Sequence, residues 1–203
     1  MRLLLLGLAL TLSCLAQPAW YVAGLGGIAT LSGDTRRPAS SPIAVAFYEP
    51  ENGAAWNLAA GRHLNDWFSV QGNYIGNRNR LEWTYFGDNL RTSIPYRTAQ
   101  HAGVADLLLY FRGRRDWIRP YLSAGIGAAH TRADLGIPQL LGKETSVDVL
   151  MRVAVGVDVP LTGNLRFRYS FSESLSGNPF AGPVPARKAF MNFQNLFGAV
   201  WYF

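Results

Sequence analysis

A long, strict alternation of apolar and polar residues is the feature that most constrains this chain. Across Val147–Val159 every second residue is Val or Met, whereas the interleaved positions include Asp148, Arg152 and Asp158. A period of two predicts a β-strand with one wholly apolar face. Because the opposite face carries charges of both signs, the pattern favours a strand that faces lipid on one side and a packed polar interior on the other.

The last fifteen positions, Ala189 to Phe203, repeat this pattern with larger side chains. One face carries Phe193, Phe197, Trp201 and Phe203, while the other mixes Gly and amides with a few apolar residues. A soluble edge strand normally shows a charge or a proline at its end, and this one ends on large rings. The alternative is the last strand of a soluble sandwich.

Eight such segments are predicted, separated by connections that alternate strictly between long and short. The long connections are Gly33–Asn52, Arg78–Tyr96, Arg132–Thr145 and Leu175–Lys188. Most of the segments are about nine residues or longer, enough for a tilted strand to cross a bilayer. We therefore predict an all-β fold: a closed, eight-stranded antiparallel up-and-down transmembrane barrel with short periplasmic turns and long extracellular loops. A soluble lipocalin-like barrel would instead turn its apolar face inward.

The first sixteen residues have the pattern of an export signal. Arg2 precedes the apolar run Leu3–Leu12, and small residues lead to a cleavage point before Gln17. We predict a cleaved signal peptide over residues 1–16 and a barrel domain over 17–203, placed in the bacterial outer membrane. Cys14, the only cysteine, raises the alternative of a lipid-modified N-terminus, although the residues before it differ from the lipoprotein pattern.

Composition excludes several other classes of protein. The chain has 19 Lys and Arg against 13 Asp and Glu, but its basic residues are scattered, which argues against nucleic-acid binding. His63, His101 and His130 are too far apart in the sequence to form a metal or catalytic set. We expect no cofactor, no metal and no catalytic residues.

Three stretches together resemble a known family: RPYLSAGIGAAHTRA, VAVGVDVPLTGNLRFRYSFSES and the aromatic terminus at Phe203. They look like the small eight-stranded outer-membrane barrels typified by the OmpA transmembrane domain and OmpX. The resemblance implies that outer-membrane lipid and lipopolysaccharide surround the protein, and that periplasmic chaperones and the barrel-assembly machinery, which reads the aromatic end, act during biogenesis. It also implies a monomer, with loops available to a surface ligand.

Inward charges in a closed barrel must be paired, because an isolated buried charge costs several kcal/mol. We predict a network in which Asp106 meets Arg152 and Arg168 at similar mid-barrel depth. Arg166 is expected lower, with amide side chains nearby at Asn57, Gln71 and Gln194. This network is either the polar core of the barrel or, as the resemblance to OmpA implies, a salt-bridge gate.

Aromatic residues near the predicted strand ends are expected to form an interfacial girdle that sets the depth of the barrel in the membrane. They are Trp67, Tyr110, Phe111, Trp117, Trp201 and Phe203. Basic residues of the long loops are expected to be solvated or to contact lipid phosphates or polysaccharide: Arg78, Arg80, Arg91, Arg97, Arg187 and Lys188.

The leading functional expectation is a non-enzymatic barrel, without an open pore, that stabilises the envelope or binds a partner through its loops. A channel for a small solute or hydrophobic ligand is the first alternative. A lipid-modifying enzyme is the second, and it would need a Ser, a His and an acid that converge on the outer wall near lipid.

Overall fold

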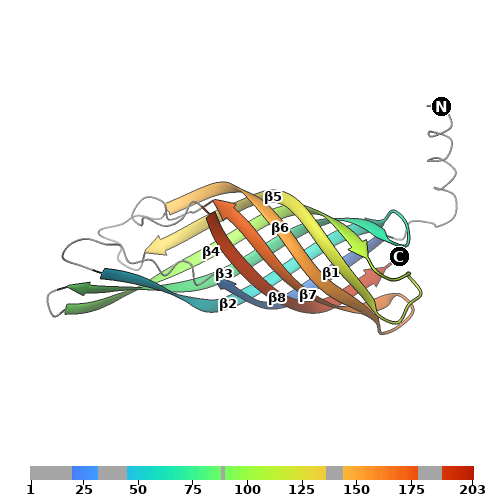
Figure 1. Ribbon diagram of the computed structural model, residues 1–203, viewed down its shortest axis with the longest axis horizontal. Helices are drawn as coiled ribbons and strands as arrows, with labels where there is room; N and C mark the ends of the chain where they lie inside the picture. Colours follow the sequence, from blue (N-terminus) through green and yellow to red (C-terminus); the bar gives the residue numbers. More distant parts are fainter. Residues whose placement is uncertain (1–19, 32–44, 88–89, 136–143, 178–188) are drawn as a thin grey trace, which may run out of the picture.

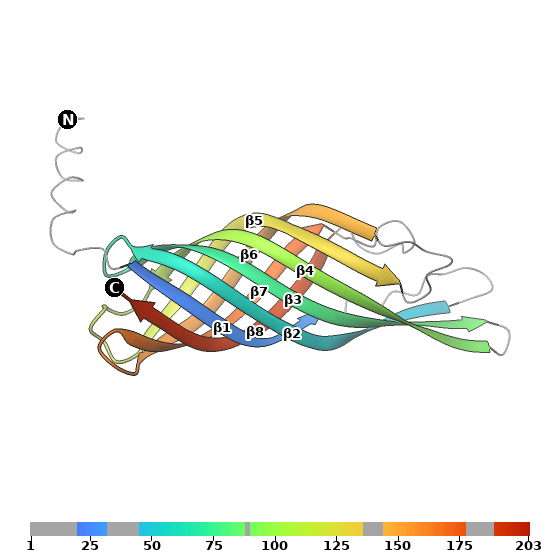
Figure 2. The ribbon, with the colours of Figure 1, turned by 180° about the vertical axis from the view of Figure 1, so that it is seen from behind.

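The computed structural model describes residues 20–31, 45–87, 90–135, 144–177 and 189–203, and these form one closed antiparallel barrel (Figure 1). Each strand pairs with the next, and β8 returns to β1 (Figure 2). The strands are β1 (Trp20–Leu31), β2 (Val45–His63), β3 (Phe68–Gly87), β4 (Leu90–Tyr110), β5 (Arg119–Leu135), β6 (Glu144–Pro160), β7 (Leu165–Gly177) and β8 (Ala189–Tyr202).

The register sets the tilt of the strands. Following register partners around the barrel from Trp20 leads back to β1 at Thr30, ten residues further along. A shear of ten in eight strands corresponds to a tilt of about 40°. Phe203 extends the closure beyond the last strand, because its N–H donates to the carbonyl of Trp20 over 3.0 Å.

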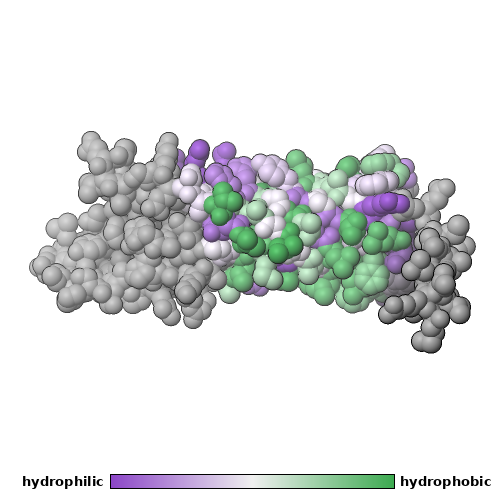
Figure 3. All heavy atoms as spheres, turned by 90° about the horizontal axis from the view of Figure 1, so that it is seen from above, coloured by the Kyte–Doolittle hydropathy of each residue, from purple (hydrophilic) through white to green (hydrophobic). Residues whose placement is uncertain are grey.

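The two faces of each strand differ as the alternation predicts. Outward side chains such as Ile126, Val147 and Val149 are more than 60% exposed, whereas inward ones such as Asp106, Arg152 and Arg168 are almost fully buried. Figure 3 shows that hydrophobic residues make up much of the visible wall. The barrel is therefore apolar outside and polar inside, the reverse of a soluble barrel. The described residues include no helix long and apolar enough to cross a membrane.

All four predicted loops contain strand residues, and in two of them the strands continue over long stretches. β2 begins at Val45 and not after Asn52, and β3 and β4 pair as far as Gly87 and Leu90, within the predicted loop Arg78–Tyr96. Paired backbone thus continues past the barrel as a three-stranded protrusion formed by residues 45–51, 80–87 and 90–97 (Figure 1). The sequence misses this extension because polar residues and prolines interrupt its alternation, while continued hydrogen bonding to the neighbouring strand maintains the pairing.

Register also gives each residue an approximate height along the barrel axis. At this tilt, each residue along a strand adds about 2.4 Å of height. Each step from a residue to its register partner on the next strand adds about 3 Å. Measured from Trp20, next to the short turns, Trp201 lies at roughly 2 Å, Trp56 at roughly 17 Å and His101 at roughly 23 Å.

These heights predict how tryptophans respond to lipid-borne quenchers. An apolar belt about 25 Å tall that starts at Trp20 has its midplane nearer to Trp56 than to Trp201. In single-tryptophan variants in vesicles, lipids brominated near the ends of their acyl chains should quench Trp56 more strongly than Trp201. Lipids brominated near the headgroup should reverse the order, and equal quenching of both residues would contradict these heights.

Candidate functional site

A buried ion pair occupies the interior near the short turns. Arg168 of β7 faces Asp158 of β6, its register partner, and donates through Nε and Nη2 to the two carboxylate oxygens over 2.6 and 2.7 Å. The remaining Nη1 donates to Oε1 of Gln71, across the barrel on β3, over 2.8 Å. Two parallel hydrogen bonds between guanidinium and carboxylate are the strongest form of such a pair.

Four tyrosines and a histidine surround this pair. The hydroxyls of Tyr110 and Tyr202 donate to Oδ2 of Asp158 over 3.3 and 3.4 Å, and the guanidinium of Arg168 lies 5.0 Å above the Tyr121 ring. Tyr21 donates to Gln71 over 3.0 Å, and His63 stacks on Tyr202 with ring centroids 5.7 Å apart. We call this set the periplasmic plug: Tyr21, His63, Tyr110, Arg119, Tyr121, Asp158, Arg168 and Tyr202.

Arg119, at the start of β5, completes the plug. Its guanidinium lies 3.9 Å from the centroid of the Tyr110 ring, and its Nη2 donates to the backbone oxygen of Asp66 over 3.0 Å. Arg119 is fully buried, so these contacts replace the water that its charge would otherwise hold. The contact with Asp66 joins the turn after β2 to the turn before β5.

Two glycines make room for the rings. Gly61 is the register partner of Tyr21, and Gly156 is the register partner of Tyr121. A Cβ added at either glycine would lie 2.4 Å from the ring of its tyrosine. Each ring thus lies flat across the neighbouring strand, in space that only glycine leaves open.

A second ion pair lies further from the turns. Arg152 of β6 donates from Nη1 to Oδ2 of Asp106 on β4, and both side chains are buried. Asn73 accepts from Gln71 over 2.6 Å and from Asn57 over 3.0 Å, so a row of amides leads up from the plug. Among the described residues, Oδ1 of Asp106 and Nε of Arg152 have no partner, as expected where ordered water completes a buried polar layer.

Above the second pair the interior becomes apolar and then polar again. Five buried apolar residues pack together on one side: Ile75, Ala102, Val104, Ala129 and Leu150. Leu25, Ala29, Ala55 and Leu196 pack on the other. Beyond them, Gln100 accepts from Asn77 over 3.0 Å and from Asn192 over 3.4 Å. From the short turns upward, charged and aromatic side chains, then apolar ones and then amides therefore fill the barrel in successive layers.

The predicted network exists as two pairs and not one. Arg152 does meet Asp106, but Arg168 meets Asp158, a residue that the predicted network omits. Arg168 is also not at mid-barrel depth: its register row places it roughly 11 Å closer to the turns than Arg152. Arg152 and Arg168 flank the same turn, but the register partner of Arg152 is Ser174, six residues further along β7 than Arg168.

The other predicted lumen residues also lie inside. Asn57 and Gln71 belong to the amide row, and Gln194 accepts from Ser172 over 3.5 Å. Arg166 lies near the turns, where its guanidinium sits 5.4 Å from the Tyr202 ring and donates to the backbone oxygen of Arg114.

One predicted girdle position is wrong. Tyr110 does not belong to a girdle: it is fully buried in the plug, since it lies four positions after Asp106 and an even spacing keeps both on one face. His63 is the last residue of β2 and is also fully buried. The alternation of β2 and β4 could have revealed both placements.

Five of the predicted girdle residues are exposed, as an interfacial role requires. They are Trp67, Phe111, Trp117, Trp201 and Phe203. Arg78 and Arg97 are exposed on the outer wall. Side chains of Arg80, Arg91, Arg187 and Lys188 lie outside the described part of the structure, as do residues 1–16 with Cys14, so the signal peptide stays a prediction.

A model of the outer membrane protein beta-barrel domain matches residues 3–196 of the chain. The chain belongs to this family. Membership confirms the resemblance to outer-membrane barrels. It also accounts for the apolar outer wall, which faces the lipid of the bacterial outer membrane. The short turns are then periplasmic and the protrusion lies outside the cell. No curated protein sequence matches the chain.

Solved structures of such barrels share the fold at low sequence identity. Neisserial surface protein A is 14% identical, with a TM-score of 0.54 over 93% of this chain and all of that one. OprG from Pseudomonas aeruginosa is 14% identical, with a TM-score of 0.56 over 91% and 96%. Ail, the attachment invasion locus protein of Yersinia pestis, solved with the heparin analogue sucrose octasulfate, is 12% identical, with a TM-score of 0.51 over 92% and 97%.

Within the described ranges, no three His, Cys, Asp or Glu side chains come together in a way that could hold a metal ion. His63 lies inside the plug, whereas His101 and His130 are exposed register partners on the outer wall. His101 contacts Tyr74 through a hydrogen bond of 3.3 Å between the hydroxyl and Nδ1.

Proposed function

We propose that this protein is a closed, non-enzymatic outer-membrane barrel that stabilises the envelope and presents its protrusion to a partner at the cell surface. The periplasmic plug carries the proposal. It places buried rings and a doubly hydrogen-bonded ion pair across the interior. An eight-stranded barrel is just wide enough for side chains to fill it.

The protrusion supports a surface role. Its strands continue the pairing of β2, β3 and β4, so it is an extension of the barrel wall. The register includes aromatic residues at neighbouring positions, such as Tyr48 beside Trp83. A paired sheet loses little conformational entropy when it binds, which favours recognition by a partner.

The test of closure is conductance in planar bilayers. The wild-type protein is expected to give no steady current. A variant that removes two plug rings, Tyr110→Ala with Tyr121→Ala, should open a small aqueous path and conduct. A heat-modifiable gel band, which reports a closed barrel, must be present for both proteins, and the double substitution Tyr74→Ala with Phe197→Ala on the lipid face serves as control.

Steady current through the wild-type protein at neutral pH would contradict closure and favour the small-solute channel. The surface role has a separate test: cells that display the protein are compared with cells that display a version shortened by residues 81–96. Loss of adhesion to matrix or host-cell surfaces in the shortened version supports this role, and equal adhesion argues for a purely structural one.

A further inference from the structure

Basic side chains gather on the outer wall where β3, β4 and β5 approach the extracellular side. Arg78 and Arg132 are exposed and share one register row, with Ala99 between them. His101 and His130 are exposed register partners in the adjacent outward row. The other neighbours in the arginine row are Ala54 on β2 and Thr145 on β6, so no carboxylate lies beside either guanidinium in that row.

This basic cluster of Arg78, His101, His130 and Arg132 lies at the height of lipid headgroups. Register places it roughly 23–31 Å from Trp20. The apolar belt of such barrels is about 25 Å tall. The four side chains therefore project from the outer wall at the level where lipid phosphates of the outer leaflet are found.

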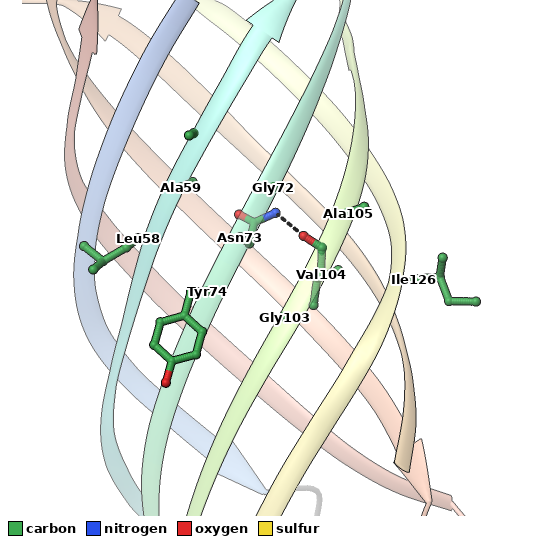
Figure 4. A pocket seen from close by; sticks show the side chains of 10 residues that line it. Leu58, Ala59, Gly72, Asn73, Tyr74, Gly103, Val104, Ala105 and Ile126 are labelled. Atoms are coloured by element: carbon green, nitrogen blue, oxygen red, sulfur yellow. Dashed lines mark hydrogen bonds between the residues drawn. The ribbon is translucent and has the colours of Figure 1, made fainter. Parts of the chain in front are cut away.

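A shallow apolar groove crosses β2, β3, β4 and β5 on the outer wall, closer to the short turns than the cluster, and Figure 4 shows the residues that line it. It has a volume of about 640 Å³. Gly72 and Gly103 form its floor with Ala60 and Ala105, and a Cβ added at Gly103 would meet no atom within 4 Å. Leu58, Tyr74 and Ile126 project around it from β2, β3 and β5. A wall of small residues rimmed by larger ones leaves room for a flexible hydrocarbon chain.

Tyr74 joins the groove to the basic cluster. Its ring borders the groove and packs edge-on against Trp56 at 5.2 Å, and its hydroxyl contacts Nδ1 of His101 over 3.3 Å. When the hydroxyl donates, Nδ1 is the acceptor and the ring proton is on Nε2, which is then free to donate. In that tautomer His101 presents a hydrogen-bond donor above the groove.

We propose that this wall binds one phosphate-bearing lipid of the outer leaflet, with an acyl chain in the groove and the phosphate against the basic cluster. Arg78 and Arg132 supply charge-assisted hydrogen bonds to phosphate oxygens, and His101 supplies another. The proposal rests on the membrane placement of the barrel and does not depend on whether the interior conducts.

Native mass spectrometry of the full-length mature protein with added lipid A tests the proposal. Wild type is expected to retain one lipid A, and Arg78→Gln with Arg132→Gln should weaken retention about tenfold or more, since two charged hydrogen-bond partners are lost. Arg115→Gln, in an exposed periplasmic turn, is the matched control and should bind like wild type. Equal retention by the double variant would overturn the proposal.

Two further arms separate the parts of the site. Gly103→Phe fills the groove and should also lower retention, whereas Val149→Phe places the same ring on the outer wall on β6 and should not. Dephosphorylated lipid A should bind at least tenfold more weakly than lipid A, and equal binding of both would refute the role of the phosphate. If wild type forms a dimer and the Gly103→Phe variant does not, the groove is a contact between two copies of the chain. That result would overturn the lipid assignment.

Discussion

Replacing Asp158 with asparagine is expected to lower the free energy of unfolding by about 3 to 5 kcal/mol, because the fully buried guanidinium of Arg168 would lose its counter-charge. The carboxylate of Asp158 accepts hydrogen bonds from Nε and Nη2 of Arg168 and from the hydroxyls of Tyr110 and Tyr202. Asparagine has nearly the same size, so the loss reports charge and hydrogen bonding and not a cavity. Urea unfolding in lipid vesicles, followed by tryptophan fluorescence, measures it.

The matched control is Asp66→Asn. Asp66 is exposed in the turn after β2, and its backbone oxygen, which accepts from Arg119, is retained by the substitution. This variant is expected to unfold within about 0.5 kcal/mol of wild type.

A double-mutant cycle separates the pair from its surroundings. Arg168→Met alone leaves Asp158 unpaired and Asp158→Leu alone leaves Arg168 unpaired, whereas the two substitutions together remove both charges. The double variant should be more stable than the sum of the single losses predicts, by about 1 kcal/mol or more. Strict additivity, or a loss below about 1 kcal/mol for Asp158→Asn, would mean that the two charges do not depend on each other for stability.

Adding a methyl group at Gly156 is expected to destabilise the barrel by about 1 to 3 kcal/mol, although alanine favours strand over glycine elsewhere. The new Cβ would lie 2.4 Å from the Tyr121 ring and 2.4 Å from the backbone oxygen of Tyr169. The ring must then leave its place across β6, and with it the contact 5.0 Å from Arg168. The heat-modifiable band and urea unfolding report the loss.

Gly26→Ala is the control for this change, because a Cβ at Gly26 meets nothing within 4 Å. It should leave stability unchanged or raise it slightly. A second comparison places Gly156→Ala in a Tyr121→Ala background, where the ring is absent. The methyl group should then cost less than in wild type, and an undiminished cost would assign the strain to the strand backbone alone.

Much of this barrel follows from local patterns. The alternation in Val147–Val159 predicts which face of β6 meets lipid, and the charged residues on the opposite face predict a polar interior. Asp106 and Arg152 are predicted as partners because both fall on inward positions, and the structure joins them. Period-two patterning suffices here, because each side chain of a strand has only two directions available.

Partner choice within the interior does not follow from the same pattern. Arg168 pairs with Asp158, its neighbour on the adjacent strand, and Tyr110 turns into the plug above Arg119. Heights along the axis depend on the shear, which is a property of all eight strands together. Arg168 lies nearer the turns than predicted because the β6–β7 register pairs Arg152 with Ser174, six residues beyond Arg168.

The sequence by itself determined the strand faces, the strand number, the long and short connections and the outer-membrane family. These depend on residue spacing and composition, which any segment carries alone. Only the tertiary structure decided the register, and with it the two separate ion pairs, the glycines beneath Tyr21 and Tyr121 and the basic cluster above the groove. The physical reason is closure: eight strands must share one shear, and that single number sets which distant residues meet.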